Sequence, residues 1–459
     1  MADFTYLTAI TPVDGRYRKQ VEELSNYFSE NALICARIEV EVRYLIALSE
    51  VGVVREFTSK EKTKLLRLRS RVSQSMISRV KKLENEVKHD VKAVENTLRE
   101  LLGAGSLKNV VEMIHFGLTS EDVNNLAWRL NISRANQKVI KPWIETLVNH
   151  LCNKAIEYKK IPMLARTHGQ AALPTTVGKE FANVAVRLHS QFTKLKKATL
   201  SGKLNGAIGN YTAMQYAVPD IDWVKFSRDF VESFGFIPET FTTQINPNDD
   251  IVELLQTYHR FNTVLLDFNQ DMWRYISDGW FFQELKKGEV GSSTMPQKIN
   301  PINFENSEGN LGLANSLIEH FANKLPVSRL QRDLSSSTVM RNIGLVYAYQ
   351  LIAYKSAING LKKVSPNQNE LKLSLRGNWA ILTEAAQTLL RQSGVKNAYD
   401  LVKKMSRGQK IEPKDWKRWV EGLPVRVAVR KKLTKLRPEN YIGLASELTE
   451  MAVTEIRSS

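Results

Sequence analysis

The stretch GSSTMPQKINP, residues 291–301, separates two segments, about 249–286 and 302–324, in which apolar residues recur at helical spacing. It combines a glycine, two serines, a lysine, an asparagine and two prolines. Glycine permits unusual backbone angles, whereas the prolines restrain the far end of the segment. We interpret it as a lid-like loop, rich in functional groups, between two long helices of an all-α protein.

The composition of the chain favours the same class. Its 459 residues are 43% hydrophobic, enough for a large core, and 14 prolines and 23 glycines suit helices better than a β-sandwich or barrel. Cys35 and Cys152 stand in helical patterns without a CxxC partner. We therefore predict buried free thiols in a reducing cytosol, and neither a disulfide framework nor a zinc cluster.

The charge of the chain indicates the kind of partner. A net charge of +17 concentrates anions, but the basic residues are mixed with acids and no nucleic-acid-binding motif accompanies them. The first residues lack a basic segment followed by an apolar run, and no stretch approaches 18 apolar residues. We expect a soluble, cytoplasmic protein with small anionic ligands, and no binding to nucleic acid or membranes.

Helical spacing divides the chain into three expected domains. Patterns over about 17–50 and 59–101 predict an N-terminal helical domain, residues 1–111. After residue 364 the patterns shorten and become more basic, which predicts a C-terminal helical domain, residues 365–459.

The central domain, residues 112–364, is expected to hold the longest helices. Thr119 and Asp122 match a capping box that opens a helix reaching about Lys160, with a kink or junction at Pro142. Further long patterns cover about 177–200, 249–286, 302–324 and 329–364. Helices of this length bury their apolar stripes against equally long neighbours, so we expect a bundle shared between subunits.

The histidines supply a candidate general acid. Four fall inside helical patterns and are interpreted as structural: His150, His189, His259 and His320. His89, His115 and His168 stand at predicted loop–helix junctions, and His168 in RTHGQ is flanked by polar residues. A histidine holds and releases a proton near neutral pH, which favours His168 as the general acid. Metal binding is not predicted, because HExxH, HxH and a cysteine partner are absent.

The serines of the opening stretch supply a candidate base or nucleophile. Ser292 or Ser293 can act so only if its alkoxide is stabilised, which Lys298 and backbone N–H groups are placed to do. The SxxK pattern of penicillin-recognising enzymes is not met, because Met295 stands three residues after Ser292. Acyl transfer is therefore disfavoured.

GSSTMPQKINP closely resembles the signature loop of the fumarase and aspartase superfamily, whose members eliminate a group β to a carboxylate and release fumarate. Within it, the chain resembles the adenylosuccinate lyase family over nearly its whole length. The segments that carry this resemblance are TPVDGRY, KHDVKAVE, IHFGLTSEDVNN, RTHGQ, GKLNGAIGNY, NFENSEGNLGL, SRLQRDLSSSTVMRN and RPENYIG. The resemblance implies a three-domain fold, a homotetramer whose central helices assemble shared active sites, and no cofactor or metal.

The resemblance also implies a reaction. It is the reversible cleavage of adenylosuccinate to AMP and fumarate, and of the ribotide SAICAR to AICAR and fumarate. Ser292 corresponds to the general base and His168 to the general acid. Lys298, Asn300 and Ser293 correspond to groups that stabilise the carboxylate when it gains a second negative charge.

The resemblance assigns the remaining substrate-binding positions to Arg16, Tyr17, His89, Asp90, Thr119, Ser120, Gln244, Asn306, Arg332, Ser337 and Arg341. Arg16, Arg332 and Arg341 suit a phosphate, because the arginine fork matches its geometry. Three alternatives stay open. Asp90 is also placed to cap a helix starting at Val91, and Tyr17 and Gln244 are also suited to packing.

Two departures from the family pattern concern details of loop closure and nucleotide binding. Gln297 stands where histidine is frequent, and Lys88 stands where a small polar residue is more usual. The alternatives are another fumarate-releasing lyase, such as argininosuccinate lyase, and a helical scaffold or RNA-binding protein that has lost the chemistry. Intact Ser292, His168 and Lys298 argue against the scaffold.

Overall fold

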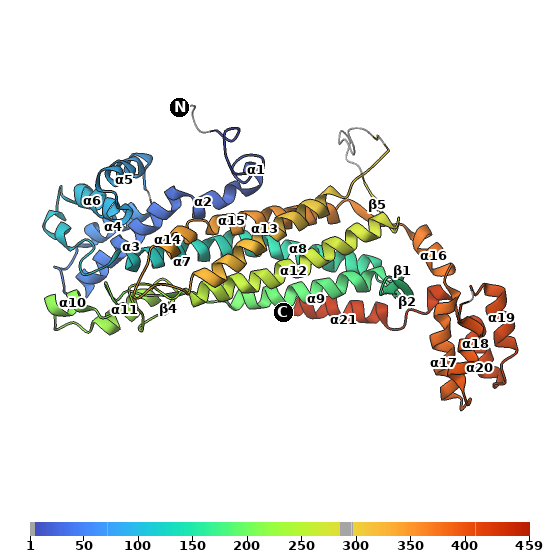
Figure 1. The fold of residues 1–459 in the computed structure, drawn as a ribbon. Helices are drawn as coiled ribbons and strands as arrows, with labels where there is room; N and C mark the ends of the chain where they lie inside the picture. The colour runs from blue at the N-terminus through green and yellow to red at the C-terminus, as the bar shows by residue number, and fades with distance from the viewer. Residues whose placement is uncertain (1–4, 71, 285–294, 296, 409) are drawn as a thin grey trace. The chain divides into compact units, whose positions relative to one another are not determined.

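The computed structural model describes residues 5–70, 72–284, 295, 297–408 and 410–459 (Figure 1). In these residues the regular structure is overwhelmingly helical, and the strands form short two-stranded sheets. The predicted all-α class is confirmed. Ser292 and Ser293 lie outside the described residues.

The chain forms two compact units, each assembled from segments distant in sequence. Unit 1 comprises Met1–Ile144, Phe192–Asn262 and Gly309–Ala353, and unit 2 comprises Glu145–Gln191, Thr263–Glu308 and Tyr354–Ser459. The division into three domains, 1–111, 112–364 and 365–459, stays a prediction.

Several of the long helices have residues in both units. They are α8 (Lys141–Tyr158), α9 (Val177–Lys197), α12 (Asp249–Ser277), α13 (Ile302–Lys324) and α15 (Ile343–Leu361). Those expected over 177–200 and 302–324 are confirmed. The helix expected to reach residue 286 ends at Ser277, because Gly279 adopts a left-handed conformation (φ +74°). The pattern over 329–364 forms two helices, with a break after Met340.

Unit 1 holds the first third of the chain and the short elements between α9 and α12. Its elements are α1 (Arg18–Val21), η1 (Glu22–Leu24), α2 (Ser25–Phe28), α3 (Glu30–Glu50), α4 (Ser59–Ser70), α5 (Gln74–Val87), α6 (Asp90–Leu102), η2 (Lys108–Met113), α7 (Ser120–Ala135), the π-helical turn η3 (Asn136–Ile140), β3 (Ser201–Gly202), α10 (Thr212–Ala217), α11 (Trp223–Glu232), β4 (Ile237–Pro238) and α14 (Ser335–Met340). Strands β3 and β4 pair in parallel.

The core of unit 1 forms where α3 packs against α7. Leu33 and Ala36 of α3 meet Ala127 of α7, and all three side chains are buried. The helix expected from Thr119 to about Lys160 is present as α7, η3 and α8 in succession. The π-helical turn directly precedes Pro142, which agrees with the expected irregularity, because proline lacks the N–H that a regular turn requires.

Unit 2 combines the remaining strands with the C-terminal helices. Its elements are β1 (Pro162–Thr167), β2 (Gln170–Thr176), β5 (Phe281–Gln283), β6 (Val364–Pro366), α16 (Gln368–Arg376), η4 (Trp379–Leu382), α17 (Thr383–Gln392), α18 (Ala398–Ser406), α19 (Pro413–Glu421), α20 (Val427–Lys435), η5 (Pro438–Asn440) and α21 (Ala445–Ser458). The pairs β1–β2 and β5–β6 are antiparallel. Aromatic packing supports the unit, with Phe181 in edge contact with Phe268.

The two cysteines are free thiols in different surroundings. Cys152 is buried, whereas Cys35 is partly exposed, so the expectation of two buried thiols is wrong for Cys35. Burial raises the pKa of both thiols. Neither is a reactive thiolate at neutral pH.

Candidate active site

A cavity of about 360 Å³ lies in unit 1 and is lined from α3, α5, α6, α7, α14 and nearby loops. Six of the predicted binding residues line it: His89, Asp90, Ser120, Arg332, Ser337 and Arg341. They come from three sequence regions, about 89, 120 and 332–341. The fold of unit 1 therefore gathers these six predicted residues around one space.

The start of α6 places His89 and Asp90 at the cavity. His89 is the N-cap, and its Nδ1 accepts a hydrogen bond from the Lys92 backbone N–H at 3.2 Å. Asp90 is thus the first helical residue, and the alternative that it caps a helix beginning at Val91 is wrong. Lys88 ends α5 in the left-handed conformation (φ 57°), which small polar residues such as asparagine adopt more readily.

Asp90 is the centre of an ion-pair cluster. Its Oδ2 accepts hydrogen bonds from the Arg37 guanidinium at 2.6 Å and from Arg341 at 2.8 Å. Burial alone would raise the pKa of Asp90, but Arg37, the backbone N–H of Val91 and Arg341 together outweigh it, so the pKa is lowered. The Asp90 carboxylate thereby holds Arg341, a predicted phosphate ligand, at the cavity.

Arg37 is a site residue that the sequence analysis missed. It is 2% exposed, lines the cavity, and donates through Nε to Asn124 Oδ1 at 2.8 Å. The available signal was a single arginine in the apolar run ICARIEV, which is costly to bury without an anionic partner. Sequence did not show that Asp90, 53 residues away, is that partner.

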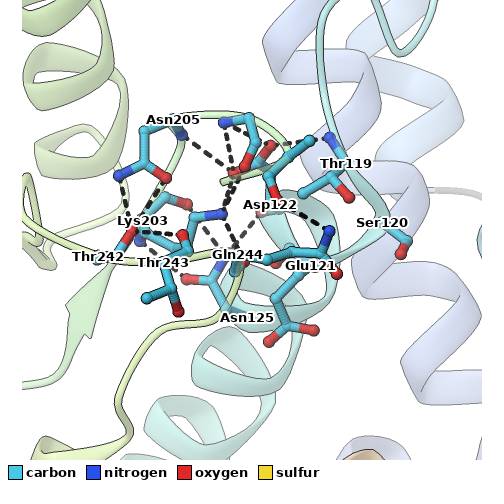
Figure 2. A network of polar contacts seen from close by, with 12 residues as sticks. Thr119, Ser120, Glu121, Asp122, Asn125, Lys203, Asn205, Thr242, Thr243 and Gln244 are labelled. Carbon is cyan, nitrogen blue, oxygen red and sulfur yellow. Dashed lines mark hydrogen bonds and ion pairs between the residues drawn. The ribbon is translucent and has the colours of Figure 1, made fainter. Parts of the chain in front are cut away.

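A fully buried ion pair holds the start of α7. Asp122 and Lys203 are both 0% exposed, with Nζ 2.9 Å from Oδ1 (Figure 2). Asp122 Oδ2 also accepts from the backbone N–H of Thr119 at 2.9 Å, which confirms the predicted capping box. The backbone N–H of Asn205 donates to Asp122 Oδ1 at 3.1 Å. The pair therefore joins the helix start to the loop after β3.

Lys203 extends the network toward Arg332. Its Nζ donates to the Gln244 carbonyl at 2.7 Å, and the Gln244 side chain accepts from Arg332 through Oε1 at 3.0 Å. Gln244 Nε2 donates to the Ala207 carbonyl at 2.9 Å. Gln244 does not itself line the cavity but orients an arginine that does. Arg332 also lies 3.5 Å from Ser120 Oγ.

Glu121 is a second residue that the sequence analysis missed. It lines the cavity, its side chain is 13% exposed, and an Arg332 nitrogen lies 3.9 Å from Oε2. Burial raises the pKa of this carboxyl, and the charges of Arg332 and Lys203 only partly offset the effect. The available signal was the pair of adjacent acidic residues in TSED. The capping box accounts for Asp122 but gives no role to Glu121.

The predicted general acid belongs to unit 2. His168 and Gly169 form the two-residue turn between β1 and β2, both with positive φ (53° and 75°), and His168 is exposed. A tight hairpin tip thus presents the imidazole, rather than the loop–helix junction that was expected. Arg166 lies over the Trp280 ring at 4.9 Å, which braces the hairpin.

The other predicted residues are placed as follows. Lys298 is exposed and Asn300 half-buried in the segment before α13, and Asn306 of α13 donates to Ser356 Oγ at 2.7 Å, all within unit 2. Arg16, Tyr17 and Thr119 belong to unit 1 but do not line the cavity. Their roles in substrate binding stay predictions, as do those of Ser292 and Ser293.

The described part of the chain contains no group of three histidine, cysteine or acidic side chains suited to hold a metal ion. Among the same residues, no helix is long and apolar enough to cross a membrane. The cavity itself offers arginine, histidine and hydroxyl donors, a set suited to an anionic ligand.

Solved structures share this fold. A fumarate lyase from Mesorhizobium sp. BNC1 superposes with a TM-score of 0.77 at 18% identity, covering 94% of this chain and 97% of that chain. A 3-carboxy-cis,cis-muconate lactonizing enzyme from Pseudomonas putida gives a TM-score of 0.76 at 18% identity, covering 95% and 97%. At this identity the likeness concerns the fold alone.

Sequence comparison defines the class and then the family. The Lyase family model matches residues 15–314, and the adenylosuccinate lyase C-terminal model matches residues 328–442. The adenylosuccinate lyase of Escherichia coli (strain K12) is 43% identical over 98% of this chain and 99% of its own, and that of Haemophilus influenzae is 45% identical over 97% and 98%. The class is that of the lyases. Within it, the chain belongs to the adenylosuccinate lyase family.

Proposed function

We propose that the chain cleaves adenylosuccinate to AMP and fumarate, and SAICAR to AICAR and fumarate, in purine nucleotide biosynthesis. The observation that carries the proposal is the 43–45% identity to adenylosuccinate lyases over 97–98% of the chain. A cavity lined by arginines and hydroxyl groups in unit 1 agrees with a substrate that carries a phosphate and two carboxylates. Argininosuccinate lyase activity and a scaffold without chemistry are not favoured.

The chemistry is a β-elimination by proton transfer. Ser292 removes a proton from the carbon next to a carboxylate, and the electrons of that C–H bond pass into the carboxylate, which then carries two negative charges. Lys298, Asn300 and Ser293 stabilise this charge. The carbon–carbon double bond of fumarate then forms as the carbon–nitrogen bond breaks, and His168 protonates the departing nitrogen.

The nucleotide end of the substrate occupies the cavity of unit 1 in this proposal. Arg16, Arg332 and Arg341 bind the phosphate, while Thr119 and Ser120 stand at the start of α7, where free backbone N–H groups favour an anion. His89 and Asp90 line the same space. Tyr17, Gln244, Asn306 and Ser337 are the remaining proposed binding residues.

The proposed assembly is a cytoplasmic homotetramer whose active sites draw residues from several subunits. Large apolar side chains on the long helices support this, because Val186 of α9, Trp273 of α12 and Ile302 of α13 are 42%, 43% and 59% exposed in the single chain. Burying such side chains favours association.

The test is conversion of adenylosuccinate to AMP by the purified protein, followed by ultraviolet absorbance, with argininosuccinate as a control substrate. We expect turnover of adenylosuccinate and SAICAR only. Ser292→Ala and His168→Gln should each lower kcat by about 10² to 10⁴-fold while folding is retained. His150→Gln, a change in α8, is the matched control and should keep wild-type turnover. Near wild-type turnover by Ser292→Ala would contradict the assignment of the base.

A further inference from the structure

Glu121 differs from the other acidic residues around the cavity. Asp90 accepts hydrogen bonds from two arginines, and Glu84 accepts one from Lys81 Nζ at 2.6 Å. No hydrogen bond to the Glu121 carboxylate is present among the described residues. Its closest cation, Arg332, stands at 3.9 Å, beyond hydrogen-bond distance.

This arrangement is unfavourable in the ligand-free protein. The Glu121 side chain is only 13% exposed, so it loses part of its hydration, and no donor of the protein replaces what is lost. The raised pKa of the carboxyl expresses the same cost. A carboxylate that opens into a cavity and has no donor from the protein is explained if the donor belongs to the ligand.

The position of Glu121 is set before any ligand binds. It is the second residue of α7, between Ser120 at the cavity and Asp122 in the buried network. Figure 2 shows its carboxylate directed away from the Asp122–Lys203 pair. Because the ion pair and the capping box hold the helix start, the carboxylate is presented to the cavity at little further cost in conformational entropy.

The ligand group that meets Glu121 must be a neutral donor, since a phosphate or carboxylate beside it would be repelled. In a nucleotide the ribose is bonded directly to the phosphate, and two of the proposed phosphate ligands, Arg332 and Arg341, line the same cavity. The departing nitrogen, by contrast, is assigned to His168 of unit 2. The ribose hydroxyls are therefore the donors closest to the anchors of this cavity.

We infer that Glu121 accepts hydrogen bonds from the vicinal hydroxyls of the substrate ribose, and so makes the enzyme selective for ribonucleotides over deoxyribonucleotides. The inference rests on the proposed function and adds a specificity-determining residue to it. A carboxylate with two oxygens suits a vicinal diol, because each oxygen accepts from one hydroxyl.

The experiment combines two proteins with two kinds of substrate. Wild type and Glu121→Ala are assayed for kcat/KM with adenylosuccinate and with its 2′-deoxy and 3′-deoxy analogues. For wild type, removal of a hydroxyl should lower kcat/KM by about 10- to 100-fold, as expected for a hydrogen bond to a charged group. For adenylosuccinate, kcat/KM of Glu121→Ala should fall below the wild-type value by a similar factor. For the deoxy analogues, kcat/KM of Glu121→Ala should be less than about 3-fold below the wild-type value for the same analogue.

A matched control separates this effect from a general change in charge. Glu112 is 79% exposed, pairs with Arg99 and lies outside the cavity. Glu112→Ala should keep the wild-type preference for the ribo substrate. Binding of AMP and 2′-deoxy-AMP by calorimetry gives a second measurement, with Glu121→Gln in place of alanine if that variant does not fold.

Two outcomes would overturn the inference. If the wild-type protein has the same kcat/KM for ribo and deoxy substrates, Glu121 makes no productive hydrogen bond with a ribose hydroxyl. If Glu121→Ala loses the same factor on all substrates, the carboxylate acts by positioning Arg332 rather than by contact with ribose. Both require a wild type that cleaves adenylosuccinate, and a wild type without that activity would instead overturn the proposed function.

Discussion

At the scale of single residues, the pKa values of two carboxyls at one cavity are shifted in opposite directions. Arg37, the Val91 backbone N–H and Arg341 together outweigh burial and lower the pKa of Asp90, whereas burial raises the pKa of Glu121. A lowered carboxyl pKa adds stability above the unfolded-state value, and this stability is lost as the pH falls. A raised carboxyl pKa favours the folded state at low pH, and this benefit is lost as the pH rises through the folded-state value.

The Glu121→Gln variant should therefore be more stable than wild type at neutral pH, where the glutamate is charged in the unfolded chain. The amide removes the cost of burying that charge, so its Tm in the ligand-free protein should rise. The advantage should shrink as the pH falls below the ordinary glutamate pKa of about 4.3. Calorimetric melting between pH 4 and 8 measures this, with Glu112→Gln as the exposed control. A lower Tm for Glu121→Gln at pH 7 would contradict the prediction.

The proposed phosphate contacts make a prediction at the same scale. Arg341→Ala should weaken binding of AMP by about 10- to 100-fold, because a charge-assisted hydrogen bond is lost. The loss should be much smaller for adenosine, which has no phosphate. Arg329→Ala is the control, since Arg329 is 85% exposed and does not line the cavity. Equal losses for AMP and adenosine would assign Arg341 to its ion pairs with Asp90 and Glu30 rather than to the phosphate.

At the scale of elements, the start of α7 depends on the Asp122–Lys203 pair. Asp122→Asn should destabilise the protein by about 3–5 kcal/mol, because it leaves the Lys203 ammonium buried without a counter-charge. The double variant Asp122→Asn with Lys203→Met should regain much of that loss, since the unpaired charge is then absent. Denaturant unfolding measures both. Additive losses in the double variant would show that the two charges do not stabilise each other.

Elements with strong periodicity were the most predictable part of the fold. The helices over 177–197 and 302–324 were predicted because a buried stripe requires apolar residues at helical spacing. The His168–Gly169 hairpin was not, because strands β1 and β2 are short and their pairing depends on backbone contacts that leave little trace in hydrophobic spacing. The break after Met340 was missed because the apolar pattern continues through it.

At the scale of the whole molecule, the proposed tetramer predicts that inactive subunits restore each other. Ser292→Ala and His168→Gln proteins, dissociated and reassembled in equal amounts, should recover activity toward roughly a quarter of the wild-type sites if each site draws the two residues from different subunits. In an equal mixture, half of the subunits supply a native Ser292 and half supply a native His168, so a site receives both with a probability of about one quarter. Subunit exchange is verified by mass spectrometry of tagged chains, and exchange without activity would place both residues in one subunit.

The sequence by itself determined the helical class, the family and the identity of most candidate site residues, because apolar spacing and chemical motifs are local properties of the chain. Only the tertiary structure decided which residues share a cavity and which charges meet. Arg341 contacts Asp90 across 251 positions, and Arg37 reaches the same carboxylate from α3. Burial, pairing and the resulting pKa shifts arise from such distant contacts, so Arg37 and Glu121 became visible as site residues only in the folded chain.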